Sequence, residues 1–393
     1  MLLLFADDML ELSDTVMRLQ KLLNELEIFC SKWGLTVNLD KTKVMVFRRG
    51  GRIKMNEKWY FKGQKLETVP FYKYVGLMTT SRLNWTLAQR TLACQATKST
   101  FVIKKANVVS GGLSPGVLLN LFDKLIRPIL LYGSEIWGCN THKCIEMVHI
   151  KFLKYVLGLP LNASNAAVLG ECGRYPIGIF AELRAVKYWL KVSCMEEDRL
   201  PKAALKMQVA LDERNKKCWV TGIKEILYKY GFGIVYLQGN VGCINGFMSQ
   251  LKERMCFHYC TEWLDDIAQN ARLQTYATFK TMLEPERYLF CIENRLYRKA
   301  IAQFRCSCHQ FMIEKGRHLN IPRNERVCTR CNVLEDEMHV VVNCTKYEAL
   351  RKYYLPEIVS KNITFTEIMG SKNDVTIMYL VKYLYAVMKC NFS

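Results

Sequence analysis

Hydrophobic and polar positions in the first eighty residues alternate between continuous apolar runs and helix-like spacing. The run at residues 1–5 is apolar throughout, which predicts a buried β-strand at the start of the chain. A helix-period stripe follows, with Ser13 as its expected N-cap and Gly34 as the residue that ends it. Strand character returns at residues 43–47, and a hairpin-like region ends at residues 72–77.

From about residue 84 onward, apolar residues recur at helical spacing over most of the chain. The segments with this spacing are 88–105, 115–129, 147–157, 177–194 and 200–211. Glycines at 228–246 indicate a loop or boundary, and residues 316–330 are basic and loop-like. These patterns predict an α+β fold that is mostly helical, with a few antiparallel strands near the N-terminus.

Composition adds a partner class to this picture. The chain of 393 residues carries 56 Lys and Arg against 36 Asp and Glu, a formal net charge of +20. Such a charge repels itself unless a polyanion is bound, so nucleic acid is the first candidate partner and an anionic membrane surface the second. No apolar run approaches the roughly 20 residues of a membrane span, so we expect RNA or DNA as the partner and no membrane.

The 17 cysteines are an odd number scattered over a long chain. Without an export signal, they indicate buried thiols in a reducing compartment rather than a disulfide framework. The expected location is therefore intracellular, in the cytoplasm and nucleus. A secreted disulfide protein that lacks its signal is the alternative.

Two adjacent carboxylates, Asp7 and Asp8, follow the first apolar run. On a tight turn at the end of a buried strand, they are hard oxygen ligands of the kind that Mg²⁺ binds. Two metals held in this way can activate a 3′-hydroxyl and stabilise the departing pyrophosphate in nucleotidyl transfer. Taken alone, an Asp-Asp pair after an apolar run is more often an ordinary turn.

A second candidate site lies near the C-terminus, where Cys328, Cys331, His339 and Cys344 form the pattern Cys-x2-Cys-x7-His-x4-Cys. Zinc prefers thiolate and imidazole ligands, and the first two cysteines can bind one ion from a tight turn. The metal would also order a segment that is too polar to fold around a core of its own. The pattern predicts a zinc knuckle, with chance clustering as the alternative. The cluster at 306–309 has an awkward spacing for one ion, and we expect no metal there.

Basic residues surround this knuckle, with tyrosines between them. Cations bind phosphates and aromatic faces stack on unpaired bases, so the segment is a candidate surface for single-stranded or structured RNA. A solvated basic face is the alternative. The residues expected to contact nucleic acid are Arg317, Arg323, Arg326, Arg330, Lys346 and Tyr347, with Arg351 just beyond them.

Several phrases of the chain resemble the reverse transcriptases of non-LTR retrotransposons. LLLFADDMLEL is similar to their aspartate box, GLTVNLDKTKVMVF to the next palm segment, and YKYVGL to the primer-grip hairpin. YGSEIWG and GECGRYP resemble phrases of the helical region after the polymerase, and residues 313–344 resemble the C-terminal knuckle region. The order and spacing agree, and the resemblance covers most of the chain.

The resemblance implies both roles and domain order. Asp7 and Asp8 would bind Mg²⁺, and Lys41 would stand near the triphosphate, where a cation helps pyrophosphate to leave. Gly76 would allow the tight primer-facing turn, with Lys73 beside it on the nucleic-acid side. The implied domains are a truncated palm with a primer-grip-like hairpin at 1–80, thumb-like helices at 81–165, a helical connecting region at 166–312 and a zinc-knuckle region at 313–393.

One departure from the family limits the expected activity. The fingers and a further catalytic aspartate precede the aspartate box in this family, and here only four residues precede Phe5. Two aspartates without a third ligand bind Mg²⁺ poorly. We therefore expect a polymerase fragment that binds RNA and DNA but is inactive by itself, with the upstream polymerase and endonuclease segment as its partner. The alternatives are a zinc-dependent nucleic-acid-binding remnant retained by a host, and a helical scaffold that binds neither zinc nor RNA.

Overall fold

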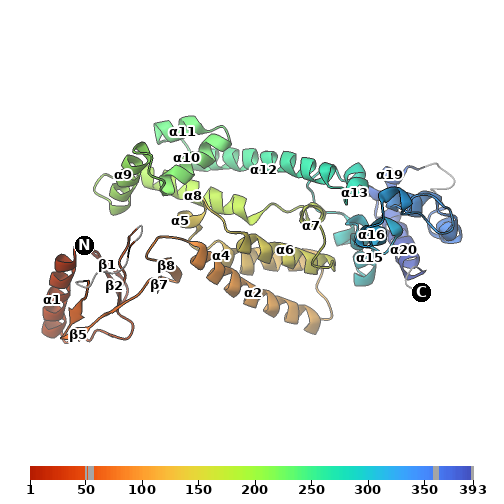
Figure 1. Ribbon diagram of the computed structural model, residues 1–393. Coiled ribbons are helices and arrows are strands. Elements are labelled where there is room, and N and C mark those ends of the chain that lie inside the picture. The colour runs from red at the N-terminus through yellow and green to blue at the C-terminus, as the bar shows by residue number, and fades with distance from the viewer. Residues whose placement is uncertain (49–50, 52–56, 357–362, 391–393) are drawn as a thin grey trace. The chain divides into compact units, whose positions relative to one another are not determined.

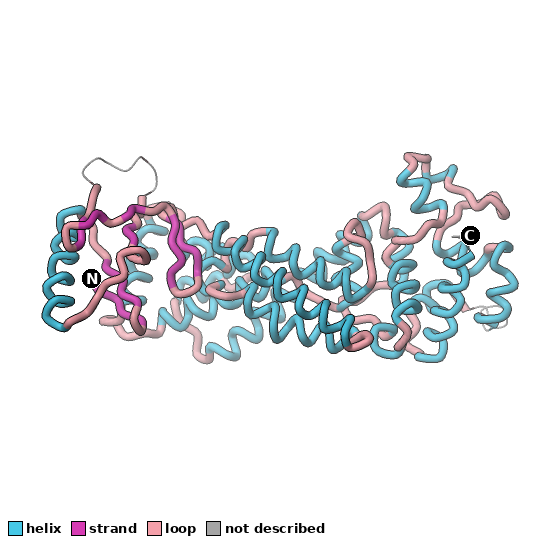
Figure 2. The backbone as a smooth tube through the Cα atoms, turned by 90° about the horizontal axis from the view of Figure 1, so that it is seen from below, coloured by secondary structure: helices cyan, strands magenta, loops and turns pink. Residues whose placement is uncertain are grey.

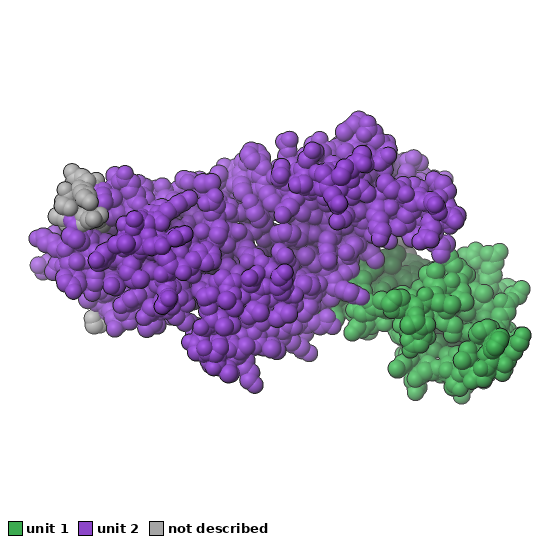
Figure 3. Space-filling view, turned by 180° about the vertical axis from the view of Figure 1, so that it is seen from behind, with its two compact units in different colours: residues 1–91 green, residues 92–393 purple. Residues whose placement is uncertain are grey.

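The computed structural model describes residues 1–48, 51, 57–356 and 363–390. Contacts within the chain divide it into two compact units, residues 1–91 and 92–393 (Figure 3). In these described ranges the strands belong to the first unit, and the second unit is built from helices (Figure 2). The chain is therefore a mostly helical α+β protein, which confirms the fold class predicted from the apolar spacing.

The strands of the first unit pair two by two. Three antiparallel hairpins join β1 to β2, β4 to β5, and β7 to β8, and β3 pairs with β6 in parallel. The pairs β1–β2 and β7–β8 are labelled in Figure 1. The bounds are β1 Leu2–Phe5, β2 Asp8–Glu11, β3 Lys43–Val44, β4 Tyr60–Phe61, β5 Gln64–Lys65, β6 Glu67–Thr68, β7 Phe71–Tyr74 and β8 Leu77–Thr80.

Helix α1 (Val16–Trp33) follows the predicted apolar stripe. Thr15 is its N-cap, because the Thr15 hydroxyl accepts a hydrogen bond from the Arg18 backbone N–H at 3.2 Å. The predicted cap, Ser13, is therefore wrong by two residues. Gly34 ends the helix with a left-handed φ of 64°, as the sequence predicted, because a glycine has no Cβ to clash in that conformation.

A small core holds α1 against the strands that follow it. The Gln20 side chain donates to the Tyr60 carbonyl at 2.8 Å and accepts from the Tyr60 N–H at 2.9 Å, so it pairs with the backbone of β4. The Trp59 indole N–H donates to the Val16 carbonyl at 3.2 Å. The buried members of this core are Leu23, Val44, Trp59, Phe61 and Leu66.

The burial predicted for the first strand is wrong. Leu4 and Phe5 of β1 are 66% and 60% exposed. A continuous apolar run is buried only when a second layer covers the strand. Among the described residues β1 pairs with β2 alone, so the hairpin leaves these side chains open to solvent.

Helices make up the second unit, and α2 begins in the first unit and continues into it (Figure 1). The earlier helices are α2 Thr86–Val109, α3 Pro115–Leu121, η1 Phe122–Ile126, α4 Arg127–Leu130, α5 Ser134–Trp137, α6 Lys143–Leu157, α7 Asn165–Cys172, α8 Ile177–Ser193, α9 Leu200–Glu213, α10 Trp219–Lys229 and α11 Gly233–Gln238. The later ones are α12 Ile244–Gln269, α13 Gln274–Phe279, α14 Tyr288–Cys291, α15 Arg295–Arg305, α16 Met312–His318, η2 Arg323–Glu325, η3 His339–Asn343, η4 Thr345–Tyr347, α17 Glu348–Tyr354, α19 Phe365–Met369 and α20 Asp374–Cys390.

The long helix α12 contributes to two hydrophobic cores of the second unit. Phe247 and Leu251 belong to one core, while Trp263 and Ile267 belong to the other. The Trp263 indole N–H also donates to the Ala166 carbonyl at 2.9 Å, which fixes α12 to α7. Within the described part of the chain, no helix has the length and apolar character needed to cross a bilayer.

Candidate zinc centre and basic surface

The first two cysteines of the predicted knuckle lie on a closed turn. The Cys328 N–H donates to the Val333 carbonyl at 2.8 Å, and the Asn332 N–H donates to the Cys328 carbonyl at 2.8 Å. Asn332 takes a left-handed φ of 53°, a conformation that asparagine tolerates better than most side chains. This geometry turns Cys331 back toward Cys328, so both thiols face the same side.

The other two ligands come from the π-helical turn η3. The Cys344 N–H donates to the His339 carbonyl at 2.8 Å, a bond between residues five apart. Such a bond widens the turn, so side chains five apart lie on one side of it rather than on different sides of an α-helix. The Asp336 carboxylate accepts from the His339 N–H at 2.8 Å and fixes the start of this turn.

The four side chains converge on one point. The ligand atoms of Cys328, Cys331, His339 and Cys344 all lie within 4.8 Å of one another. The Cys344 sulfur is 3.8 Å from that of Cys328 and 4.0 Å from that of Cys331. Zinc–sulfur bonds of about 2.3 Å in a tetrahedron place sulfurs about 3.8 Å apart. In the described structure His339 Nε2 is buried without a hydrogen-bond partner, as expected for a metal ligand.

The thiols of this centre differ in their acidity. The Thr345 hydroxyl, 3.2 Å from the Cys331 sulfur, and the Thr345 N–H, at 3.4 Å, lower the pKa of Cys331 to about 7. Burial raises the pKa of Cys344 to about 12 and lowers the pKa of His339. Zinc binds thiolates and neutral imidazole, so Cys331 and His339 are already close to their ligand forms at neutral pH.

Hydrogen bonds from α17 and α20 hold the backbone of the centre in place. Arg351 is buried and donates to the Val341 and Cys344 carbonyls, both at 2.8 Å. The Tyr383 hydroxyl on α20 donates to the Val340 carbonyl at 2.6 Å. Arg351, predicted to lie in the basic surface, is therefore a support of the knuckle backbone instead, and its guanidinium is not available to a phosphate.

A buried polar network fixes the segment before His339. The Glu337 carboxylate lies 2.9 Å from His309 Nε2 and accepts from the hydroxyls of Ser307 at 2.8 Å and Thr275 at 2.7 Å. Burial on its own would raise the pKa of Glu337, but these hydrogen bonds and the His309 charge lower it to about 2. Within the cluster at 306–309, the His309 ring is thus held by the Glu337 carboxylate.

Three of the predicted nucleic-acid contacts are exposed around the centre. They are Arg323 on η2, Arg330 between the two knuckle cysteines, and Lys346, which follows Cys344 by two residues. Because Arg330 and Lys346 lie within two residues of metal ligands, the centre fixes where their backbones stand. Arg323 is on a separate short helix that precedes the first ligand.

The other predicted contacts have different partners. Tyr347 is 1% exposed and packs edge-on against Phe311, so its ring offers no face to a base, and its place in the predicted surface is wrong. Arg326 donates to the Ile321 and Ile313 carbonyls and supports the loop. Arg317 is half-buried and pairs with Glu314 at 2.9 Å, a carboxylate that Arg272 also contacts.

The candidate catalytic residues of the first unit are all exposed. Asp7 lies in the two-residue turn between β1 and β2, and Asp8 begins β2 opposite Phe5. Among the described residues, no third carboxylate, histidine or cysteine joins them in a metal-binding group. These two aspartates stand on a hairpin, as the sequence predicted, but the strand that carries them is not buried.

The loop of Lys41 is attached to the second hairpin. The Tyr72 hydroxyl of β7 donates to the Lys41 carbonyl at 2.8 Å. Lys73, the next residue of β7, is exposed. Gly76 and Val75 form the turn between β7 and β8, with φ values of 79° and 44°. A tight hairpin of this kind needs positive φ in its turn, so the role predicted for Gly76 in the turn agrees with its conformation.

Comparisons with known proteins find similarity to two proteins of transposable elements. An uncharacterized transposon-derived protein of Caenorhabditis elegans is 28% identical over 164 residues, which is 40% of this chain and 57% of that protein. The 115 kDa protein of the type-1 retrotransposable element R1DM of Drosophila melanogaster is 23% identical over 196 residues, 48% of this chain and 19% of that protein. The chain is related to retrotransposon proteins. It spans only part of the length of these relatives.

No model of a protein family matches this retrotransposon-related chain, and no solved structure matches it.

The sequence did not reveal the residues that support the zinc centre. Arg351, Tyr383 and Glu337 carry no local pattern that separates them from surface residues or ordinary core residues. Only their contacts with distant backbone and side chains reveal what they do.

Proposed function

We propose that the chain is the C-terminal part of a retrotransposon reverse transcriptase, an RNA-directed DNA polymerase, and that it binds RNA or DNA through a zinc-dependent basic surface. The observation that carries this proposal is the preformed group of three cysteines and one histidine, with exposed cations on its own turns. The transposon-derived relatives support nucleic acid as the ligand. The net charge of +20 supports it as well.

The zinc centre orders the surface and the cations bind the ligand. Arg330 and Lys346 are exposed on or next to the turns that carry the metal ligands, and Arg323 is exposed on η2 before them. Cations of this kind contact phosphates, which gives an affinity that falls as salt displaces the condensed counterions. With Tyr347 buried, base stacking has no platform at that position. The proposed binding is therefore governed by the backbone of the nucleic acid more than by its bases.

Metal analysis and RNA binding at two salt concentrations test this function. We expect one zinc per chain, lost in Cys331→Ser, and RNA affinity that falls steeply with salt. The triple variant R323Q/R330Q/K346Q is expected to reduce the slope of log affinity against log salt by about 2 for a single strand. The matched control R214Q/K216Q/K217Q removes the same charge from exposed positions elsewhere in the unit. Affinity that ignores salt, or equal losses in the two triple variants, would contradict the proposal.

For catalysis, we propose that Asp7, Asp8 and Lys41 correspond to metal-binding and triphosphate-binding positions of the full polymerase. The lack of a third metal ligand beside the aspartates, among the described residues, favours a chain that binds nucleic acid without polymerising. That observation equally favours a non-catalytic remnant retained by a host. Incorporation of labelled nucleotide on a primed RNA template by the purified chain, with Mg²⁺, would refute the proposal that this chain does not polymerise.

A further inference from the structure

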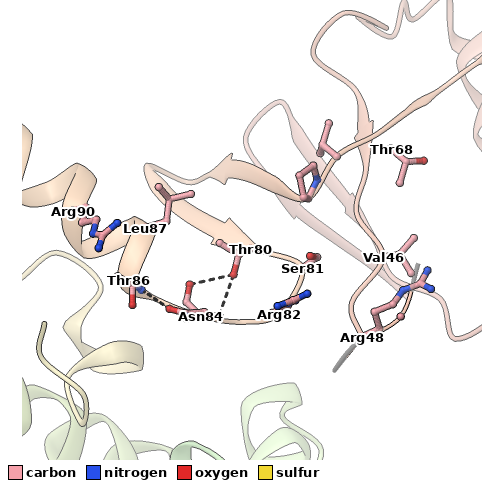
Figure 4. A pocket seen from close by; sticks show the side chains of 13 residues that line it. Val46, Arg48, Thr68, Thr80, Ser81, Arg82, Asn84, Thr86, Leu87 and Arg90 are labelled. Carbon is pink, nitrogen blue, oxygen red and sulfur yellow. Dashed lines mark hydrogen bonds between the residues drawn. The ribbon is translucent and has the colours of Figure 1, made fainter. Parts of the chain in front are cut away.

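A cavity of about 820 Å³ opens in the first unit, away from the zinc centre in the sequence (Figure 4). Its lining residues come from three places in the chain. They are Val46, Arg48 and Gly51 after β3, residues 68–70 from the end of β6 to the start of β7, and residues from the end of β8 to the first turns of α2. A volume near the upper end of the ~300–1,000 Å³ range of ligand pockets exceeds the needs of a single small ion.

The charged residues that line this cavity are arginines. Arg48, Arg82 and Arg90 line it, and none of the described lining residues is acidic. Arg48 is paired with Glu57 at 2.6 Å. Arg82 and Arg90 are exposed, and no carboxylate in the described chain pairs with either. Two guanidinium groups are thus left to bind an anion, and guanidinium forks match phosphate oxygens in geometry.

Neutral donors and the start of a long helix add to the attraction for an anion. Ser81, with its hydroxyl, and Asn84, with its side-chain amide, are lining residues, and Asn84 caps α2 through its side-chain oxygen, which accepts from the Thr86 N–H at 2.8 Å. Thr80 fixes this cap by hydrogen bonds with the Asn84 backbone at 3.0 and 3.1 Å (Figure 4). The positive end of the helix dipole therefore lies at the wall of this cavity, which Thr86 and Leu87 line.

Apolar side chains also line the cavity. Val46, Val69, Pro70 and Leu87 are among its lining residues, and Figure 4 shows Leu87 next to Arg90 and Val46 next to Arg48. A free phosphate would leave these apolar side chains unused, whereas a nucleotide has an anionic part for the arginines and a sugar and base for the apolar side chains. The lining thus favours a phosphate ester of a nucleoside over an inorganic anion.

We propose that this cavity is a second nucleic-acid site, which binds nucleotides of a single strand with Arg82 and Arg90 on their phosphates and Val69, Pro70 and Leu87 against a sugar and base. The inference rests on the proposed nucleic-acid binding and adds a site separate from the zinc centre. The strand is preferred to a free nucleotide because the chain as a whole carries +20 and attracts a polyanion.

The test compares two double variants of the full chain with the same loss of charge. R82Q/R90Q empties the cavity of its free cations, and K58Q/K65Q removes two exposed lysines of the same unit outside the cavity. With a labelled single-stranded RNA, we expect R82Q/R90Q to lose roughly tenfold in affinity at low salt and to reduce the salt slope by about 1.4. The control is expected to lose less than half as much. Equal losses in the two variants overturn the proposal.

Two further measurements keep the result clear of folding defects. R82K/R90K retains the charges and is expected to bind RNA within a few-fold of the unaltered chain. RNA that contains 4-thiouridine should crosslink to peptides that include Pro70 or Leu87, and crosslinks confined to the second unit would overturn the site. Competition separates ligand sources: a dinucleotide should displace the RNA at lower concentration than uridine monophosphate, and equal displacement by inorganic phosphate overturns nucleotide recognition.

The same data separate this inference from the proposed function. If the chain does not bind nucleic acid at all, the unaltered protein shows no salt-dependent RNA affinity. If only the cavity proposal fails, the unaltered protein binds RNA and R82Q/R90Q behaves as K58Q/K65Q does.

Discussion

The zinc centre and the hairpin of Asp7 and Asp8 are both candidate metal sites, but they differ in how the chain holds them. The four ligands at 328–344 are brought within 4.8 Å by their own turns and are supported by buried residues of α17 and α20. The two aspartates stand on an exposed two-stranded hairpin with no third ligand among the described residues. A metal site is complete within a segment only when that segment supplies every ligand and the core around it fixes their directions.

Removal of the metal should produce the largest change in stability. Cys344→Ser is expected to lose the zinc and to lower the free energy of unfolding by at least about 3 kcal/mol, because structural zinc binding contributes directly to folding. Elemental analysis and thermal melting by circular dichroism measure both changes. Cys94→Ser, at an exposed cysteine on α2, should keep the zinc and the melting temperature. An unchanged metal content in Cys344→Ser would show that these four residues do not bind the zinc.

The buried ion pair in the same core should come next. Arg305 donates to Glu171 at 2.9 Å, and both side chains are at most 2% exposed. Glu171→Gln leaves a buried guanidinium with one fewer charged partner, which we expect to cost about 3 kcal/mol in urea unfolding. Asp374→Asn, which breaks the exposed pair with Arg287, is the control and should change stability far less. Similar losses in both variants would contradict the claim that burial decides the value of the pair.

A single hydrogen bond to the knuckle should have a smaller effect. Tyr383→Phe removes the hydroxyl that donates to the Val340 carbonyl, and we expect a loss of about 1–2 kcal/mol together with weaker zinc retention. Tyr379→Phe changes an exposed ring on the same helix and should be neutral. Competition with a chromogenic chelator gives the zinc affinity, and equal affinities in the two variants would show that α20 does not support the centre.

The smallest effect is expected at the hairpin. The double variant D7N/D8N should change the free energy of unfolding by less than about 0.5 kcal/mol, because both side chains are exposed and lie on a turn. It should leave the zinc content at one per chain. A loss above about 1 kcal/mol in the melting experiment would show that the aspartates have partners that their exposure does not suggest, and the contrast between the two regions would weaken.

Local sequence signals predicted much of the fold but not its layers. The stripe from Val16 to Trp33 and Gly34 marked α1 correctly, because helix periodicity and a left-handed glycine are properties of a short segment. The burial of the first strand was predicted wrongly, since burial depends on what covers the strand. The boundaries proposed at 165 and 312 stay predictions, while the contacts of the chain divide it at residue 91.

The sequence by itself determined the four-ligand pattern, the charge of the chain and the mostly helical fold, because spacing and composition are written along the chain. Only the tertiary structure decided that Tyr347 and Arg351 are buried, that Glu337 contacts His309, and that Arg82 and Arg90 share a cavity. The sequence records an arginine in the same way whether its side chain faces solvent, a carbonyl or a carboxylate. Its function depends on which distant groups the fold places beside it, and no local pattern carries that information.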